Sequence, residues 1–369
     1  MKIVYSYNKR GFEAEIFHKA ISEGSDDRHT YVPFNHEPYV DPTAYFRAQL
    51  LDDLYYRRHE GLMRLYRDME ALLRDTKADA LLVDNAFPYH PEFLRTLDVF
   101  KVQRTTDGPI SAYDRDFAYV HAYDQVLFHS PAYSRDLDME EKLRYVGAKD
   151  ARFWPHGLFE RMYDPTKTEE TILAHERDID ILFIGAPFPS KMPLLSKVKK
   201  AFGSRCVIRG KSRLKWNLYY NAKYGMPGWI TPVAFEEYVP LYQRTKIGFN
   251  VHNRGDYTVG SYRLYELPAN GVMQISDGGK YLDAFFKTGE EIIGYDGADD
   301  LIDKIRYYLA HDEERKRIAL AGYKKVLGSD RIGQRLRRAA EMIEDGIRLK
   351  RLREAGMAAQ GSLVGRDPS

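Results

Sequence analysis

Short apolar runs recur along the chain and alternate with segments of helical periodicity. Each run is brief and rich in Val, Ile, Leu or Phe, which is the pattern of strands covered on both faces. The runs are 2–7, 80–84, 100–105, 125–129 and 151–154 in the first half, and 179–185, 205–209, 246–251, 272–276 and 291–295 in the second. Helical patterns lie between them, at 43–77, 191–202, 235–243, 298–310 and 313–326.

This alternation predicts an α/β protein with parallel sheets and right-handed crossovers, arranged as two doubly wound domains. A polar segment at 163–176 contains a proline and precedes a fresh strand, so we place the N-terminal domain at 1–165 and the C-terminal domain at 166–330. A strongly basic helix at 331–355 could cross back onto the first domain. We expect a flexible tail at 356–369.

Composition and charge describe an ordinary soluble globular protein. The 369 residues are 44% hydrophobic and 30% charged, and the formal net charge is +2, so no global field draws the chain to nucleic acid or a membrane. Cys206 is the single cysteine, which excludes a disulfide framework and fits a reducing cytoplasm. The apolar run at the start is too short for a signal peptide, and no stretch is long enough to span a membrane.

The segment YTVGSYRLYELPANGVMQISD, residues 257–277, carries the most informative pattern. Gly260 and Ser261 open a short helix that Thr258 can cap, and amides at a helix start suit a phosphate. Arg263 and Glu266 are three residues apart and project from one helical face. Arg263 can bind a phosphate and Glu266 can accept two hydroxyl protons from a ribose, but a surface ion pair explains the same spacing.

Two further basic features follow strand ends. Ser190 and Lys191 stand at a helix start, where they form either a second diphosphate contact or a plain capped helix. The glycine fingerprint of a dinucleotide site is missing there, which disfavours NAD. The stretch 205–223 mixes basic and aromatic residues without an acidic one, and Lys211 directly follows a strand end. It can hold phosphates and stack bases, or it is a cationic surface loop.

Other candidates lie in loops after strands, where open parallel sheets bind ligands. Asp107, in Thr-Thr-Asp-Gly-Pro, could take a proton from an acceptor hydroxyl, or it could bond its own turn. Gly11, His129, His156 and His252 could face the acceptor or a cleft, although a lone histidine is more often structural. No histidine or cysteine spacing matches a metal motif, so we predict no metal site.

These segments together resemble a known family. VGSYRLYELPANGVMQISD and the later FFKTGEEIIGYDGADDLIDKIRYYLAHDEERKRIALAGYKKVL resemble the C-terminal half of GT-B nucleotide-sugar glycosyltransferases, closest to the spore-maturation type. DIDILFIGAPFPSKMPLL is similar to the strand and phosphate loop that open that domain, and YDQVLFHSPAYSRDLDMEEKLRYVGAKDARFWPHGLFERMYDP to the end of the preceding one. The resemblance covers about 100–327 well.

The resemblance implies two Rossmann-like domains that face each other across a cleft, with the donor held mainly by the second. Carried over by position, Glu266 binds the donor ribose and Lys211 follows the strand that borders the nucleotide. The residues that would face the diphosphate are Arg263, Lys191, Gly260 and Ser261. The segment that would meet the base contains Ile230, Thr231 and Val233. Retaining relatives carry a Glu-x7-Glu pattern, and here Thr258 occupies its first position, so the stereochemistry stays open.

A more distant likeness is to phage DNA β-glucosyltransferase, which has a similar Arg-x-x-Glu helix and a turn like Thr106-Asp107. By that likeness Asp107 would deprotonate the acceptor in an inverting reaction. We therefore expect a metal-independent glycosyltransferase that needs no cofactor, uses a UDP-sugar as cosubstrate and acts on a hydroxyl acceptor. The alternatives are an enzyme that glycosylates hydroxymethylated DNA bases, a sugar-nucleotide epimerase and a non-catalytic nucleotide-sugar binding module.

Overall fold

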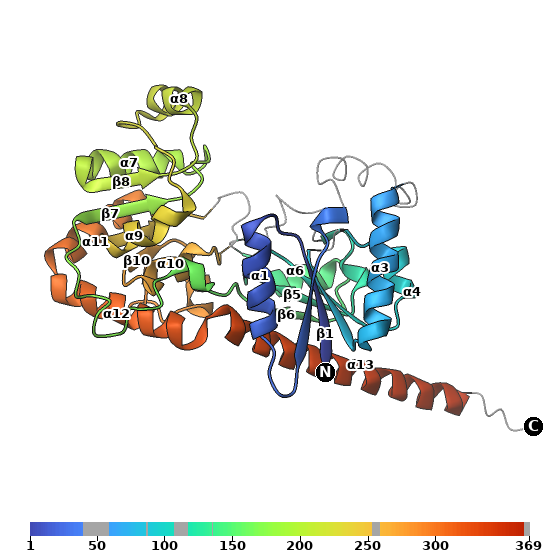
Figure 1. The fold of residues 1–369 in the computed structure, drawn as a ribbon. Helices are drawn as coiled ribbons and strands as arrows, with labels where there is room; N and C mark the ends of the chain where they lie inside the picture. The colour runs from blue at the N-terminus through green and yellow to red at the C-terminus, as the bar shows by residue number, and fades with distance from the viewer. Residues whose placement is uncertain (40–58, 86–87, 107–116, 135, 253–258, 365–369) are drawn as a thin grey trace, which may run out of the picture. The chain divides into compact units, whose positions relative to one another are not determined.

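The computed structural model describes residues 1–39, 59–85, 88–106, 117–134, 136–252 and 259–364, with the backbone alone for 356–364. The chain divides into two compact units (Figure 1). The first comprises Met1–His129, Asp138–Pro155 and Gly333–Ser369, and the second comprises Ser130–Leu137 and His156–Ile332.

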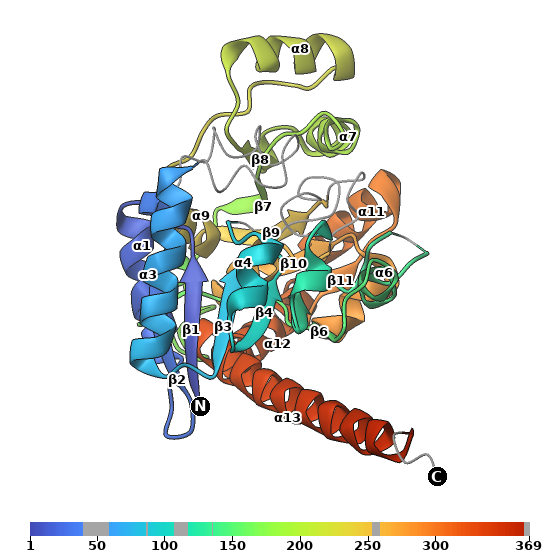
Figure 2. The same cartoon turned by 90° about the vertical axis from the view of Figure 1, so that its right-hand side faces the viewer.

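The described part of the first unit contains a six-stranded parallel sheet of order β2-β1-β3-β4-β5-β6 (Figure 2). Helix α3 packs on the sheet because its Leu65 and Met69 join Val4 and Leu81 in one buried cluster. The strands are β1 (Lys2–Tyr7), β2 (Thr30–Asn35), β3 (Ala80–Asp84), β4 (Phe100–Arg104), β5 (Gln125–Phe128) and β6 (Ala151–Phe153). The helices are α1 (Phe12–Glu23), α3 (Glu60–Thr76), α4 (Pro91–Thr96), α6 (Met139–Tyr145) and α13 (Ile332–Val364).

The second unit, as far as it is described, contains a five-stranded parallel sheet of order β11-β10-β9-β7-β8. Along β7, Ile181 and Phe183 join one buried cluster while Leu182 and Ile184 join another. Both faces of the sheet are therefore covered, which explains why its strands read as continuous apolar runs. The strands are β7 (Ile179–Ile184), β8 (Cys206–Arg209), β9 (Thr245–Asn250), β10 (Met273–Ser276) and β11 (Ile293–Gly294). The helices are α7 (Met192–Phe202), α8 (Leu214–Tyr224), α9 (Tyr238–Gln243), α10 (Arg263–Ala269), α11 (Gly297–Ala310) and α12 (Asp312–Ser329).

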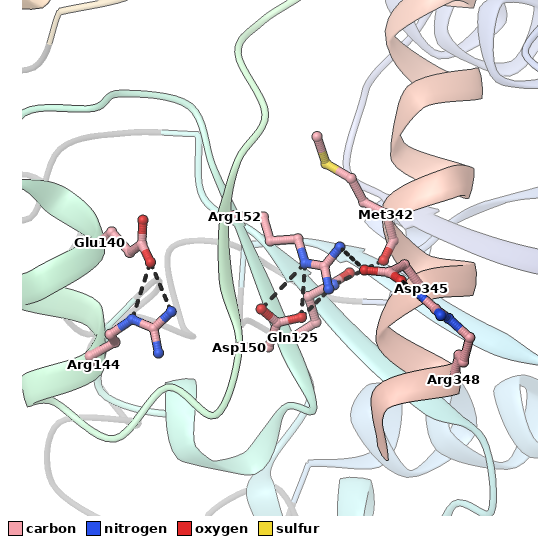
Figure 3. Close-up of polar contacts among 8 residues, drawn as sticks. All are labelled: Gln125, Glu140, Arg144, Asp150, Arg152, Met342, Asp345 and Arg348. Atoms are coloured by element: carbon pink, nitrogen blue, oxygen red, sulfur yellow. Dashed lines mark hydrogen bonds and ion pairs between the residues drawn. The ribbon is translucent and has the colours of Figure 1, made fainter. Parts of the chain in front are cut away.

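From Gly333 onward, α13 packs on the first unit. The Trp154 indole donates to the Arg335 carbonyl at 2.7 Å, and the Tyr31 hydroxyl donates to the Leu336 carbonyl at 2.7 Å. Further along the helix, Gln125 Nε2 donates to the Met342 carbonyl at 3.1 Å. Figure 3 shows the next contact, in which Arg152 reaches from β6 to Asp345 on α13, with Nη1 and Oδ2 2.8 Å apart. The helix thus completes the first unit with residues from the end of the chain.

The α/β fold class and the parallel sheets expected from the sequence are confirmed, with two local corrections. β2 was missed because Pro33 interrupts the strand pattern, and an edge strand tolerates proline. The stretch after β8, left open as a cationic loop, forms the helix α8. α13 continues to Val364 through good helix formers such as Ala358 and Gln360, and the flexibility expected for 356–369 stays a prediction.

Candidate functional site

Arg263, on α10, is directed inward at the carboxyl end of β7. Its guanidinium lies over the Phe183 ring, 5.3 Å from the centroid, and donates to the Ile184 carbonyl. Its Nε also donates to Asn250 Oδ1 at 3.2 Å. A Cβ on Gly185 would lie 2.0 Å from Arg263 Nη1, so only glycine leaves room for the guanidinium. The arginine is therefore held in one place by the ends of two strands.

Lys191, immediately before α7, brings a second cation to this edge. It is 5% exposed, and burial together with the nearby Arg263 lowers its pKa to about 7, against the opposing effect of Asp277. Among the described residues its amine makes no hydrogen bond or ion pair; its nearest recorded contact is the Phe188 ring, 5.6 Å away. A nearly buried ammonium without a carboxylate partner favours an anionic ligand.

Glu266 is buried on the same helix as Arg263. The Tyr242 hydroxyl donates to its Oε2 at 2.9 Å. Burial raises the pKa of Glu266, while the Tyr242 hydrogen bond, Arg263 and Arg161 oppose the shift. Arg263 and Glu266 thus bond different partners, and the described residues show no ion pair between them. The surface ion pair that the spacing also allowed is not what forms.

His252 and Asp277 close the carboxyl ends of β9 and β10. His252 Nδ1 lies 2.6 Å from Asp277 Oδ1, and the His252 backbone N–H donates to the same carboxylate at 2.9 Å. Because the carboxylate can only accept, Nδ1 carries the proton and Nε2 is left as an acceptor. The Gly260 N–H donates to that Nε2 at 3.4 Å. His252 thereby ties the chain before α10 to the end of β9.

This contact changes the expectation for Gly260 and Ser261. The Gly260 amide is directed at His252, and the Ser261 hydroxyl accepts from Asn250 Nδ2 at 3.0 Å. Helix α10 begins at Arg263, and Tyr262 precedes it without a side-chain cap. Thr258, the expected cap, lies outside the described residues, as does Asp107. At the carboxyl edge of the second sheet, the groups that could hold an anion are therefore the cations Arg263 and Lys191 more than the amides at the start of α10.

The residues expected near a base lie along the segment after α8. Asn217 bonds both the N–H of Ile230, at 3.0 Å, and its carbonyl, at 3.1 Å. The Thr231 carbonyl accepts from Gly210 at 3.0 Å. The Ile230 N–H is thus already used, and its carbonyl accepts one bond from Asn217, so contact of this segment with a base stays a prediction. Val233 is half-buried and Lys211 is exposed after β8.

The remaining candidates are divided between the units. In the second unit, His156 is buried and stacks on Tyr262, with ring centroids 4.4 Å apart. In the first unit, His129 Nδ1 lies 3.1 Å from the Thr105 carbonyl, which fits its structural alternative. Gly11 is exposed at the start of α1 with a positive φ of 51°.

Sequence reasoning missed three residues of this site. Asn250 and Asp277 each directly follow or end a strand, so their positions could have singled them out. Tyr242 gave no signal, because it is one of 28 tyrosines and lies in a short helix. Within the part of the chain that the structure describes, no group of three or more His, Cys, Asp or Glu is placed to hold a metal ion.

Comparison with known structures identifies this architecture. Sucrose-phosphate synthase from Thermosynechococcus elongatus superposes with a TM-score of 0.59 and 13% identity, over 97% of this chain and 99% of that one. HepE from Anabaena, solved with UDP-glucose, gives a TM-score of 0.59 and 10% identity over 94% and 100%. The fold is that of a GT-B glycosyltransferase. Arg263, Lys191 and Glu266 all lie in the second unit of this chain.

Sequence comparisons agree with the GT-B fold. A family model described as glycosyl transferase-like matches residues 192–341. Spore protein CgeB from Bacillus subtilis (strain 168) is 24% identical over 201 residues, which is 49% of this chain and 58% of that protein. The resemblance to GT-B glycosyltransferases is thus confirmed. None of the described helices is long and apolar enough to cross a membrane.

Proposed function

We propose that this chain is a glycosyltransferase that moves a sugar from a UDP-sugar to a hydroxyl acceptor without a metal ion. The observation that carries the proposal is the pair of cations at the carboxyl edge of the second sheet. Lys191 is nearly buried and Arg263 is close enough to depress its pKa. Two like charges held together in a partly dry site are costly unless an anion joins them. A diphosphate carries the charge to do so.

The chemistry that this arrangement supplies is stabilisation of the leaving group. As the glycosidic bond breaks, negative charge gathers on the departing diphosphate, and fixed cations stabilise that charge without reorganising. Asn250 and the Ile184 carbonyl hold Arg263 in place before the donor binds. Glu266 has one carboxylate oxygen bonded to Tyr242, which leaves the other to accept ribose hydroxyls.

The choice of UDP draws on similar structures, since HepE was solved with UDP and with UDP-glucose. For the acceptor, we assign Asp107 as the base of an inverting reaction. If the reaction instead retains configuration, the departing phosphate takes the proton and Asp107 is dispensable.

Thermal unfolding with UDP, ADP and GDP tests the binding half of the proposal. A ligand at a hundred times its dissociation constant adds about 2.7 kcal/mol of stability, and we expect UDP to reach this at the lowest concentration. Replacing the UDP ribose by a 2′,3′-dideoxyribose should weaken binding to the wild type, and Glu266→Gln should remove that discrimination. Stabilisation by none of the diphosphates would overturn the proposal.

Turnover of UDP-sugars tests the catalytic half. Asp107→Asn should retain UDP binding and lose transfer to a hydroxyl acceptor if the reaction inverts. A donor that isomerises with no acceptor present would identify an epimerase instead. Binding without turnover of any UDP-sugar, across a panel of hydroxyl acceptors, would leave a nucleotide-sugar binding module.

A further inference from the structure

Exposed apolar side chains are concentrated at one place in the second unit. Ten large hydrophobic side chains are exposed among the described residues, and half of them lie on α8 or just after it. These are Leu214 (59% exposed), Trp216 (42%), Leu218 (56%), Tyr219 (37%) and Trp229 (55%). Isolated exposed hydrophobics need no explanation, but such a concentration marks an interaction surface.

The geometry of α8 accounts for the exposure. The helix follows β8, the edge strand of its sheet, and Figures 1 and 2 both show it beyond α7 at the margin of the unit. Only Asn217 and Tyr220 of α8 are fully buried. Leu214 and Leu218 are four residues apart, so they lie one turn apart on the same outer side.

Charge is concentrated on the same segment. Residues 205–235 contain six Lys or Arg and no Asp or Glu, so the rest of the chain has a formal net charge of −4 against +2 for the whole. Lys211, Arg213 and Lys215 are all exposed, and in the described structure none of them forms an ion pair with an acidic side chain. The segment around α8 therefore combines exposed apolar side chains with exposed basic ones.

We propose that α8 docks this protein on an anionic lipid surface. Two exposed leucines on one side of α8, the exposed Trp216 and Trp229 in the same segment, and basic residues without an acidic partner are features of a surface that lies in the membrane interface. The leucines enter the acyl boundary while Lys211, Arg213 and Lys215 meet lipid phosphates. A nucleic-acid duplex would use the same cations but would leave the two leucines without a role, so it fits this surface less well. The proposal uses neither Lys191, Arg263 nor Glu266. Lys211 is the one residue that it shares with the donor site expected from the sequence.

Vesicle binding by the full chain provides the test. Of the three tryptophans, Trp154 is 1% exposed, so a fluorescence change on binding reports Trp216 and Trp229. We expect co-sedimentation and a blue shift with vesicles of phosphatidylcholine mixed with phosphatidylglycerol, little with phosphatidylcholine alone, and weaker binding as salt rises. Leu214→Ser combined with Leu218→Ser should lower the partition constant at least about tenfold.

The matched control replaces exposed hydrophobics elsewhere. Phe12 and Tyr145 are 73% and 84% exposed in the first unit, and Phe12→Ser with Tyr145→Ser should leave vesicle binding unchanged. Thermal unfolding of each variant checks that the fold is intact. Failure of the wild type to bind the anionic vesicles would overturn the proposal. Equal vesicle binding by the wild type and the variant with both Leu214→Ser and Leu218→Ser would also overturn it. So would tighter binding to a DNA duplex that the leucine substitutions leave unaffected.

Discussion

Burial beside Arg263 makes the charge of Lys191 depend on what occupies the strand edge. Its pKa is about 7 in the folded chain and close to 10.5 when unfolded. Between these values the unfolded chain binds more protons, so this group lets the folded state gain stability as the pH rises from about 7 to 10.5. Below about 7 the buried amine is charged in both states, and the folded state bears the full cost of holding it.

A diphosphate should reverse this shift, because an opposite charge favours the protonated amine. We therefore predict that UDP binding at pH 8 takes up close to one proton and weakens as the pH rises to 9. Lys191→Met should abolish the proton uptake, weaken UDP binding and raise the melting temperature of the free protein at pH 6. Calorimetric titration in buffers of different ionisation enthalpy measures the uptake.

Lys197→Met is the control, since Lys197 lies on α7, the helix that Lys191 precedes, and its side chain is half-exposed. It should bind UDP and take up the proton as the wild type does. Equal proton uptake by the Lys191→Met and wild-type proteins would contradict this role for Lys191.

Tyr242→Phe tests the environment of Glu266. The substitution leaves a buried carboxylate without its hydroxyl donor, which should cost about 1–3 kcal/mol of unfolding free energy at pH 7. Loss of the donor raises the pKa of Glu266 further, so in the variant the carboxyl is neutralised at a higher pH than in the wild type, and the cost should shrink as the pH falls towards 5. Urea unfolding at both pH values measures this difference.

Tyr238→Phe is the matched control for that experiment. Tyr238 lies next to Tyr242, with ring centroids 6.1 Å apart, and its hydroxyl makes no hydrogen bond among the described residues. Its replacement should change the unfolding free energy little at either pH. If both variants lost the same stability at pH 7, the carboxylate would not depend on Tyr242.

The site residues differ in how far sequence could identify them. Arg263 and Glu266 were found because helical spacing and a strand end coincide, and Lys191 because it precedes a helix after a strand. The sequence could not show which backbone N–H groups near the site are already hydrogen-bonded to other residues of the chain. The Gly260 N–H donates to His252 and the Ile230 N–H donates to Asn217, and both contacts depend on tertiary packing.

At the scale of elements, sequence located strands better than helix ends. Apolar runs such as 80–84 match their strands because both faces of each sheet are covered. β2 was not predicted because it contains Pro33 and lies at a sheet edge. The helical pattern was ended at 355, short of Val364, because glycines interrupt the helix formers at the end of α13. The hydrophobic pattern of the sequence therefore predicts a buried strand more reliably than an edge strand or the end of a helix.

Glycine in α13 offers an element-scale test of how this helix packs. A Cβ on Gly346 would lie 2.8 Å from both Phe100 Cζ and Gln125 Nε2, whereas one on Gly333 would have no neighbour closer than 3.7 Å. Alanine intrinsically favours a helix over glycine by up to about 1 kcal/mol. Gly333→Ala should therefore be neutral or stabilising, while Gly346→Ala should cost about 1–3 kcal/mol through overpacking.

Urea unfolding of the two full-length variants separates these effects. Gln125, which reaches α13 at Met342 (Figure 3), is one of the two side chains that a Cβ on Gly346 would meet. Stabilisation by both substitutions would mean that α13 lies further from the first sheet than described.

At the scale of the whole molecule, the chain leaves the first unit and returns to it. The larger part of the second unit, His156–Ile332, lies between Pro155 and Gly333 in sequence, and α13 contributes the fully buried Leu336, Ala340 and Ile343 to the first unit. The first unit therefore needs the C-terminal segment to bury its core. The candidate donor residues, by contrast, all belong to the second unit.

Hydrogen exchange of the full chain with and without UDP tests the central claim most directly. The account predicts that UDP slows exchange most in peptides covering 184–192 and 259–266, where Lys191, Arg263 and Glu266 lie. Lys191→Met should lose this protection at the same UDP concentration, and Lys197→Met should keep it. No protection in either peptide at saturating UDP, or protection confined to the first unit, would contradict the account.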